Sequence, residues 1–302
     1  MPNILKTGTL FFVGIIIVVL INFSGFFSPE DSPLKKVAEL AEELDESSGL
    51  IYTPKGLFTL NDSKKPEFYR IDTATGEILQ TISIHDIDFD DKESISFDGE
   101  YIYIGDFGNN DGDRKNLKIV KIDYSDISEK KDLSVNGEII QFHYPEQQTF
   151  DMKKKDNAFD SEAMVVAADS IYVFTKQRNN HQTTLYSLPK KTGNYAATKN
   201  AAFDVNGRIT SAALNPEQNT LLLLGYQDDH QFPFLWKFLD FSGNNFFSGN
   251  SSSVKISTSP LDWQTEGMTF KDENEIFISC ETTGDVKASL YSGNLQEMFS
   301  KN

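Results

Sequence analysis

The sequence predicts an all-β fold, a β-propeller of five blades preceded by one N-terminal transmembrane helix. A short pattern of one polar residue, one small residue and then apolar residues recurs five times. Each copy is followed by further strand-like segments with polar loops between them. The chain also holds 24 Phe and 11 Tyr, and aromatic residues favour strands. Short antiparallel strands at a period of about 50 residues are typical of propeller blades.

The recurring pattern marks the first strand of each expected blade. Its copies are Ser48-Gly49-Leu50, Glu93-Ser94-Ile95, Glu162-Ala163-Met164, Thr210-Ser211-Ala212 and Glu266-Gly267-Met268. Second strands are expected at 56–60, 101–105, 171–175, 221–225 and 276–280. Third strands are expected at 67–72, 117–122, 184–188, 234–238 and 289–292, where alternation indicates half-buried strands. Six blades are an alternative. So is a β-sandwich, although a sandwich has no reason to repeat one strand order five times.

The fifth copy of the pattern reaches the C-terminus with only three strands. In the other copies, fourth strands are expected at 78–84, 138–144, 201–205 and 254–257. The segment Leu34 to Leu40 could supply the missing strand, and such closure would remove the open sheet edges. A helix is the competing interpretation of Pro33 to Leu44, because Ala, Glu, Leu and Lys dominate that segment.

The N-terminal segment predicts a membrane anchor. Residues 7–28 carry no charge, and their apolar run can span the hydrocarbon layer of about 30 Å as a helix. Lys6 precedes the run, whereas Glu30 and Asp31 follow it, which favours a cytoplasmic N-terminus. A cleaved signal peptide is the alternative, but residues 22–27 show no clear cleavage site.

We therefore expect a signal-anchor helix in residues 1–29 and a single propeller domain in residues 30–302. The expected location is the cell membrane, as a single-pass protein whose C-terminal domain lies on the periplasmic or extracellular side. The membrane is thus one expected partner, through the N-terminal helix.

Charge and cysteine content exclude several classes of function. The net charge is −17, and nucleic-acid binding requires clustered Lys and Arg, so no nucleic-acid partner is expected. An acidic surface fits a metal cation or a cationic ligand. The single cysteine, Cys280, can form neither a disulfide within the chain nor a thiolate metal cluster, and we expect it to be buried in a strand.

One end of the predicted propeller gathers carboxylates. The first strand of each blade lines the axis of a propeller, and Glu93, Glu162 and Glu266 begin three of these strands. Hard oxygen ligands favour Ca²⁺ over zinc or copper, so these glutamates are candidate calcium ligands. The alternative is structural, with each Glu capping backbone N–H groups at a blade junction. Further candidate ligand-binding residues at the same end are Glu46, Asn61, Asp62, Asp106, Asn109, Lys176 and Asp228.

Catalytic residues stay unassigned from the sequence. His181 and His230 fall in loops at the acidic end, and either of them, or Glu162, could act as a base, although a solvated histidine is the more common case. The chain contains no G-x-S-x-G, H-E-x-x-H or P-loop motif. The loop from Asp106 to Asp113 is rich in oxygen ligands for a second cation, but Gly, Asn and Asp also form plain turns.

Five segments resemble a known family. They are Asn61-Asp62-Ser63, Tyr103-Ile104-Gly105-Asp106-Phe107-Gly108-Asn109-Asn110, Asp160-Ser161-Glu162-Ala163-Met164, Phe174-Thr175-Lys176 and Glu266-Gly267-Met268. In these segments the chain resembles bacterial secreted or lipid-anchored propellers grouped with phytase-like, esterase-like and SdiA-regulated domains. The resemblance covers about residues 40–295. The resemblance implies a propeller fold and an extracytoplasmic location more than any activity.

The glutamates at the strand starts are also similar to the calcium ligand of lactonase and gluconolactonase propellers, which implies Glu93, Glu162 or Glu266 as a ligand. The complete Glu, Asn and Asp ligand pattern of those enzymes is not traceable in this chain. Nor does the chain show the dense Asp clustering of a true β-propeller phytase.

Two hypotheses of function follow. The first is a membrane-tethered extracytoplasmic propeller that binds Ca²⁺ and serves as a scaffold or binds a small-molecule or protein ligand. The second is a metal-dependent hydrolase of esters, lactones or phosphoesters. Both predict calcium near the axis, and only the second requires a water or nucleophile beside a base.

Overall fold

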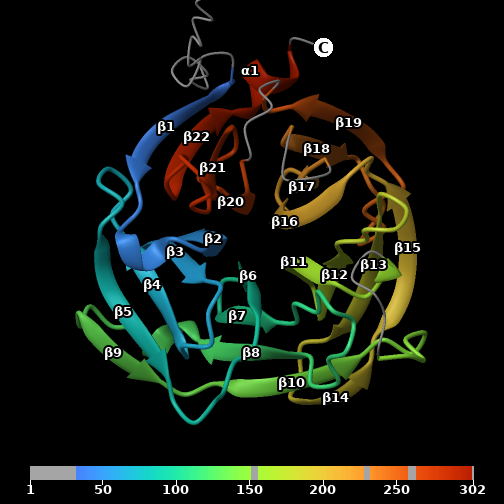
Figure 1. The fold of residues 1–302 in the computed structure, drawn as a ribbon, viewed down its shortest axis with the longest axis horizontal. Coiled ribbons are helices and arrows are strands. Elements are labelled where there is room, and N and C mark those ends of the chain that lie inside the picture. The colour runs from blue at the N-terminus through green and yellow to red at the C-terminus, as the bar shows by residue number, and fades with distance from the viewer. Residues whose placement is uncertain (1–31, 151–155, 228–231, 258–262, 301–302) are drawn as a thin grey trace, which may run out of the picture.

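The computed structural model describes residues 32–150, 156–227, 232–257 and 263–300, and these residues form a five-bladed β-propeller (Figure 1). The prediction of five blades is confirmed. The predicted membrane helix at residues 1–29 lies outside the described residues. Within the part of the chain that is described, no helix combines the length and apolarity needed to cross a bilayer.

Each blade is an antiparallel sheet whose first strand lies nearest the axis. The first blade contains β2 (Ser47–Thr53), β3 (Gly56–Asn61), β4 (Glu67–Ile71) and β5 (Ile78–Ile84). The second contains β6 (Lys92–Phe97), β7 (Tyr101–Asp106), β8 (Lys118–Asp123) and β10 (Glu138–His143). The third contains β11 (Ser161–Ala167), β12 (Ser170–Thr175), β13 (Gln182–Pro189) and β15 (Thr198–Asp204). The fourth contains β16 (Arg208–Asn215), β17 (Thr220–Tyr226), β18 (Phe234–Leu239) and β19 (Asn250–Lys255).

The fifth blade joins strands from both ends of the described chain. It contains β20 (Thr265–Phe270), β21 (Glu275–Cys280) and β22 (Ser289–Asn294), and β1 (Leu34–Glu39) pairs with β22 as its outermost strand (Figure 1). The predicted closure by the N-terminal segment is therefore confirmed. The helix interpretation of this segment is wrong, apart from one 3₁₀ turn at Glu42–Leu44.

Two short strands that the sequence did not predict link neighbouring blades at the outer rim. β9 (Asp132–Val135) pairs in parallel with β5, and β14 (Gly193–Ala196) pairs in parallel with β10 (Figure 1). Each belongs to the chain between the third and fourth strands of the following blade. Two short helices complete the secondary structure of the described residues, the 3₁₀ helix Tyr124–Asp126 and α1 (Leu295–Phe299).

Apolar side chains fill the spaces between blades. Each of the five buried clusters draws on two neighbouring blades, so that one cluster belongs to each of the five interfaces. Between the first two blades, for example, Phe58 and Phe68 pack with Ile104 and Val120. Because the burial of apolar area is the main stabilising contribution, no blade is expected to be stable alone.

The closing strand should contribute measurably to stability. Leu34 of β1 is buried, and its Cδ2 would lie 2.6 Å from a Cβ at Gly293 of β22. We expect Leu34→Ala to lower the free energy of unfolding by about 2–3 kcal/mol, through lost burial and a residual cavity. Urea denaturation measures this, with Lys35→Ala, an exposed position on the same strand, as the control. Equal effects of the two variants would mean that β1 does not close the propeller.

Candidate functional site

A one-residue β-bulge occurs at the same place in all five innermost strands. In the first blade Ser47 pairs with Asn61 and Gly49 pairs with Leu60, so Ser48 is left without a partner in the ladder. The five bulged residues are Ser48, Glu93, Glu162, Thr210 and Glu266. These are the polar residues that open the sequence repeat. A bulge redirects a side chain away from the two faces between which a regular strand alternates its side chains. The sequence repeat therefore marks the residue whose polar side chain each innermost strand redirects.

The bulged side chains meet near the axis although they belong to different blades. The charge of Glu162 raises the pKa of Glu93, and the charge of Glu266 raises the pKa of Glu162, in each case after the larger effect of burial. The two bulged hydroxyls have a structural role. Ser48 Oγ donates to the carbonyl of Lys92 at 2.9 Å, and Thr210 Oγ1 donates to the carbonyl of Thr265 at 2.6 Å.

We call the five bulged residues and their neighbours at this end of the axis the axial ring. Two further positions recur in every blade of this ring. One is the position two residues before the bulge, occupied by Glu46, Asp91, Asp160, Arg208 and Gln264. The other lies just after the second strand, and we call it the loop position. It directly follows the second-strand residue that pairs with the residue before the bulge. It is occupied by Asp62, Phe107, Lys176, Tyr226 and Glu281.

Backbone hydrogen bonds join these two positions. In the first blade the N–H of Asp62 donates to the carbonyl of Glu46 at 2.8 Å, and the third and fifth blades repeat this bond at Lys176 and Glu281. The start of the first strand and the loop after the second strand are therefore held together at the same end of the propeller. This confirms the geometry on which the sequence grouping depended.

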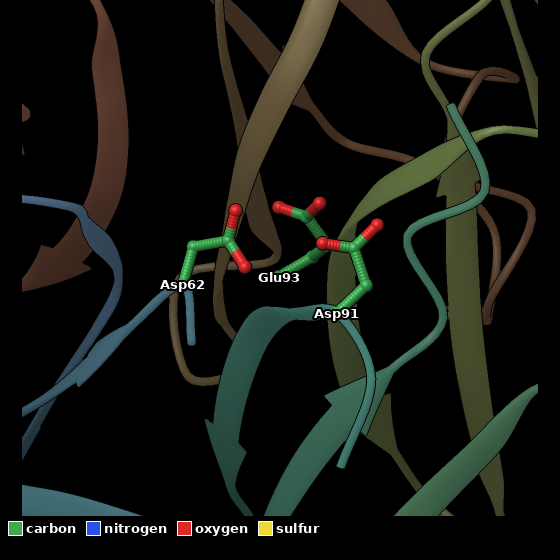
Figure 2. Close-up of side chains that lie close together, drawn as sticks. All are labelled: Asp62, Asp91 and Glu93. Carbon is green, nitrogen blue, oxygen red and sulfur yellow. The ribbon is translucent and has the colours of Figure 1, made fainter. Parts of the chain in front are cut away.

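Three carboxylates from the first two blades form the tightest acidic group. Asp62, Asp91 and Glu93 offer oxygens that all lie within 4.8 Å of one another, and their side chains point toward one another in Figure 2. Burial, followed by the charge of Asp62, raises the pKa of Asp91 to about 7. Burial raises the pKa of Glu93 well above its usual range. Without a cation, this group therefore retains protons near neutral pH.

Gly108 makes room for this carboxylate group. A Cβ at Gly108 would lie 2.3 Å from Asp91 Oδ2 and 2.5 Å from Glu93 Oε1, so any side chain would displace the oxygens. The residues also fit a metal ion in chemical type, because three carboxylates are a hard donor set of the kind that Ca²⁺ takes.

Asp106, at the end of β7, holds the backbone of Asp91 in place through hydrogen bonds. Its carboxylate accepts the backbone N–H groups of Asp91 at 2.9 Å and Asp90 at 3.1 Å. Arg114 at 2.8 Å and Lys118 at 2.5 Å neutralise it, and the Asp106 side chain is fully buried. Asp106, predicted as a ligand-binding residue, is thus engaged within the protein.

Asn109 and Asn61 are similarly engaged. The backbone N–H of Asn109 donates to Asp160 Oδ1 at 2.9 Å, and its side-chain amide donates to the carbonyl of Phe159 at 3.2 Å, which joins the second blade to the third. Asn61 Oδ1 accepts the backbone N–H of Glu46 at 2.9 Å. Both residues hold loops in place at the edge of the site.

The other two predicted glutamates, Glu162 and Glu266, lie close to Lys176. Glu162 forms a buried ion pair with Lys176. Glu266 Oε1 accepts a hydrogen bond from Tyr226 Oη at 3.2 Å. Burial, followed by the charge of Glu266, raises the pKa of Glu281 to about 9. The structure therefore divides the predicted calcium ligands, with Glu93 in the group with Asp62 and Asp91, and with Glu162 and Glu266 around Lys176.

The other predicted positions are less central. Glu46 is exposed, and burial and then Asp45 raise its pKa. The backbone carbonyl of His181 accepts the N–H of Val205 at 3.2 Å, so this histidine lies beside the outer strands of its blade. Asp228 and His230 fall outside the described residues.

An open groove of about 740 Å³ adjoins the carboxylate group. Asp91 borders both the group and the groove, and further lining residues include Lys64, Asn110, Asp111 and Lys115. At the opposite end of the axis, a smaller cavity of about 140 Å³ is lined largely by apolar residues from all five innermost strands. None of the described residues that line this second cavity is charged, in contrast to the groove beside Asp91.

Sequence reasoning missed Asp91, Tyr226 and the reason for Gly108. A signal for Asp91 was present, because it precedes Glu93 by two residues, as Glu46 precedes Ser48. The position of Tyr226 becomes visible only when the strand register is known, since it is equivalent to Asp62 and Lys176.

Comparisons with known proteins support the fold and leave the family open. No family model and no curated protein matches the chain. Among solved structures, the chain is similar to glutaminyl cyclase of Myxococcus xanthus, with a TM-score of 0.51 and 7% identity over 86% of this chain and 95% of that one.

Two further structures are similar at lower scores. The PQQ-bound aldose sugar dehydrogenase of Streptomyces coelicolor has a TM-score of 0.49 and 9% identity over 86% of this chain and 97% of that one. The α-L-arabinanase of Penicillium chrysogenum, complexed with arabinobiose, has a TM-score of 0.44 and 9% identity over 88% and 99%. The likeness to the glutaminyl cyclase, at 7% identity, shows a shared fold alone.

The raised pKa of Asp91 predicts a pH dependence of stability in calcium-free buffer. The folded protein keeps a proton that the unfolded chain releases near pH 4, so the free energy of unfolding should fall as the pH rises from about 4 to about 7. A pKa raised from 3.8 to about 7 corresponds to about 4 kcal/mol, and we expect a loss on the order of 2 kcal/mol because solvent screens this partly exposed group. Urea denaturation in EDTA over this pH range measures it. Asp91→Asn should flatten the curve, and a curve parallel to that of the wild type would contradict the assignment.

Proposed function

We propose that this chain is a membrane-tethered, extracytoplasmic β-propeller that binds Ca²⁺ at its axis and a ligand in the adjoining groove. One observation carries this function. Asp62, Asp91 and Glu93, from two different blades, bring three carboxylates within 4.8 Å of one another, at a place where Gly108 leaves them room. Only the folded propeller brings these groups together.

Electrostatics favour a divalent cation in this group. Three ionised carboxylates at such separations repel one another strongly in a partly buried site. A divalent cation offsets this repulsion and allows all three to ionise near neutral pH. Calcium suits the group better than zinc, since the chain's only cysteine, Cys280, is buried elsewhere, and none of the three donors is a histidine.

The groove supports a ligand-binding role. Its volume, about 740 Å³, falls within the range of about 300–1,000 Å³ that is common for small-molecule sites. Charges of both signs line it, among them Lys64, Lys115 and Asp111. A bound ion at Asp91 would face this groove, so a ligand oxygen could complete its coordination. A small molecule or a segment of a protein would fit such a surface.

The proposed location follows from the sequence. The uncharged apolar run at residues 7–28 supports a single membrane-spanning helix, with the propeller on the periplasmic or extracellular side. The resemblance to bacterial secreted and lipid-anchored propellers supports the same side. Extracellular calcium modules commonly bind in the range of about 10⁻⁴–10⁻³ M, and this would suit such a compartment. The net charge of −17 disfavours a nucleic-acid partner.

Calcium should stabilise the full chain, purified in a mild detergent. At a concentration about 100 times the Kd, we expect Ca²⁺ to raise the Tm by about 5 °C relative to EDTA, because only the folded state assembles the ligands. Differential scanning calorimetry measures this shift. Glu93→Gln should lose most of it, because the ion loses a charged ligand.

Two further variants sharpen this test. Gly108→Ala leaves every carboxylate in the chain but displaces two of them, so it should also lose the shift. Glu217→Gln, which changes an exposed carboxylate at the other end of the propeller, should keep it. An unchanged Tm for the wild-type chain would rule out the calcium site.

A metal-dependent hydrolase is the second candidate function. It is favoured because Asp91 belongs both to the carboxylate group and to the lining of the groove. A carbonyl or phosphoryl oxygen in the groove could reach an ion beside Asp91, and the ion would then polarise it as a Lewis acid. The full chain should in that case hydrolyse p-nitrophenyl acetate, p-nitrophenyl phosphate or a δ-lactone with Ca²⁺ and lose this activity in EDTA. Glu93→Gln should reduce the rate by at least about tenfold. Absence of turnover on all three substrates would leave the binding role alone.

A further inference from the structure

We propose that Lys176 is a built-in cation that occupies one half of the axial carboxylate ring, so that a single Ca²⁺ binds at the other half. This role presupposes the calcium site proposed above at Asp62, Asp91 and Glu93. Lys176 would thereby set how many metal ions the axis holds.

The strand register shows what Lys176 replaces. It occupies the loop position of the third blade, where the first blade has Asp62 and the fifth blade has Glu281. A positive charge therefore stands where these two blades carry a carboxylate. The blades are otherwise equivalent at this point, since the backbone N–H of each of these residues donates to the carbonyl at the position two residues before the bulge.

The contacts of the ammonium group hold it inside the ring. Lys176 Nζ forms an ion pair with Glu162 Oε2, and each side chain is only 5% exposed. The same nitrogen lies 5.1 Å from the centre of the Tyr226 ring, and Tyr226 in turn donates to Glu266. These contacts place the ammonium among the carboxylates of the third and fifth blades.

Lys176 acts on several of these carboxylates at once. Its charge lowers the pKa of Glu162, Glu266 and Glu281, in each case against the larger effect of burial, and it has a smaller effect of the same sign on Glu93. Two other nearby cations make their direct contacts outside this half of the ring. Lys92 Nζ donates to the carbonyl of Lys65 at 2.6 Å, and its charge lowers the pKa of Asp62. Arg178 pairs with Asp160, at 3.6 Å, and donates to Asn110.

Loss of the ammonium would leave buried carboxylates without a counter-charge. Such groups must either take up protons or bind another cation, because an unpaired buried charge is strongly unfavourable. Glu162, Glu266 and Glu281, whose pKa values burial already raises, would then lack the cation that now lowers them. A second Ca²⁺ could supply the missing positive charge in the space that the ammonium vacates.

Calcium titration of the full chain in mild detergent tests this role. Isothermal titration calorimetry at pH 7.5 should give one bound Ca²⁺ for the wild type and two for Lys176→Met, which removes the charge with little change in volume. Lys190→Met is the matched control, because it breaks a lysine–carboxylate pair with Asp98, 2.8 Å apart, away from the axis. This control should still bind one ion.

The outcomes separate the two proposals. No ion on the wild type would overturn the calcium site itself. One ion on both the wild type and Lys176→Met would overturn only the role of Lys176. If Lys176→Met folds only when calcium is present, calcium replaces the ammonium and the role is supported. Should this variant not fold even then, Lys176→Ala, which leaves room for a hydrated ion, decides; if that variant also fails to fold with calcium, the role is refuted.

Terbium luminescence gives an independent measurement at the same position. Tb³⁺ is a hard cation that can replace Ca²⁺, and a nearby tyrosine can sensitise its emission. Binding beside Tyr226 should therefore make the emission of Lys176→Met exceed that of the wild type. The double variant Lys176→Met/Tyr226→Phe should lose this excess, and an excess that persists would place the second ion elsewhere.

Discussion

The axial site depends on one repeated irregularity, the bulge near the start of each innermost strand. A regular strand alternates its side chains between two faces, and in a propeller both faces pack against neighbouring blades. The bulge inserts one residue that belongs to neither face. Five blades therefore deliver five polar side chains to the axis without disturbing the apolar clusters between them. In the first, third and fifth blades, a backbone hydrogen bond holds the loop after the second strand against the strand start, and this loop adds the charged residues Asp62, Lys176 and Glu281.

Charge balance explains how so many carboxylates share one end of the molecule. The two hydroxyl members of the ring, Ser48 and Thr210, are satisfied by carbonyls of the next blade and need no counter-ion. Glu162 forms a direct ion pair with Lys176, whereas the charges of Lys92, Arg114 and Lys176 affect the pKa of Asp62, Asp91 and Glu93, respectively, less than burial does. The unequal distribution of charge within an otherwise repetitive ring distinguishes a region neutralised by the protein from a region suited to an external ion.

The fold was predictable because one sequence pattern repeats in every blade. The site was less predictable because its residues differ from blade to blade. Five copies of one pattern predicted five blades, and the missing strand of the last blade predicted closure by β1. The strands β9 and β14 have four residues each and belong to no repeat, so no pattern marked them. Glu93 and Asp62 were predicted from their places at a strand start and in a facing loop. Asp106 and Asn109 share the same oxygen-rich composition, but composition alone cannot distinguish oxygens that face a ligand from oxygens engaged within the protein.

The shared construction of the fifth blade has a consequence for biosynthesis. Its outer strand, β1, leaves the ribosome before the other strands of the propeller, yet its partner β22 is among the last to emerge. The earliest strand therefore cannot pair with β22 until nearly the whole domain has left the ribosome. Because contacts between residues so distant in sequence are slow to form, closure of the ring should be a late event in folding. Glu266 and Glu281 belong to that last blade, so the axial ring is completed only when the whole domain has been synthesised.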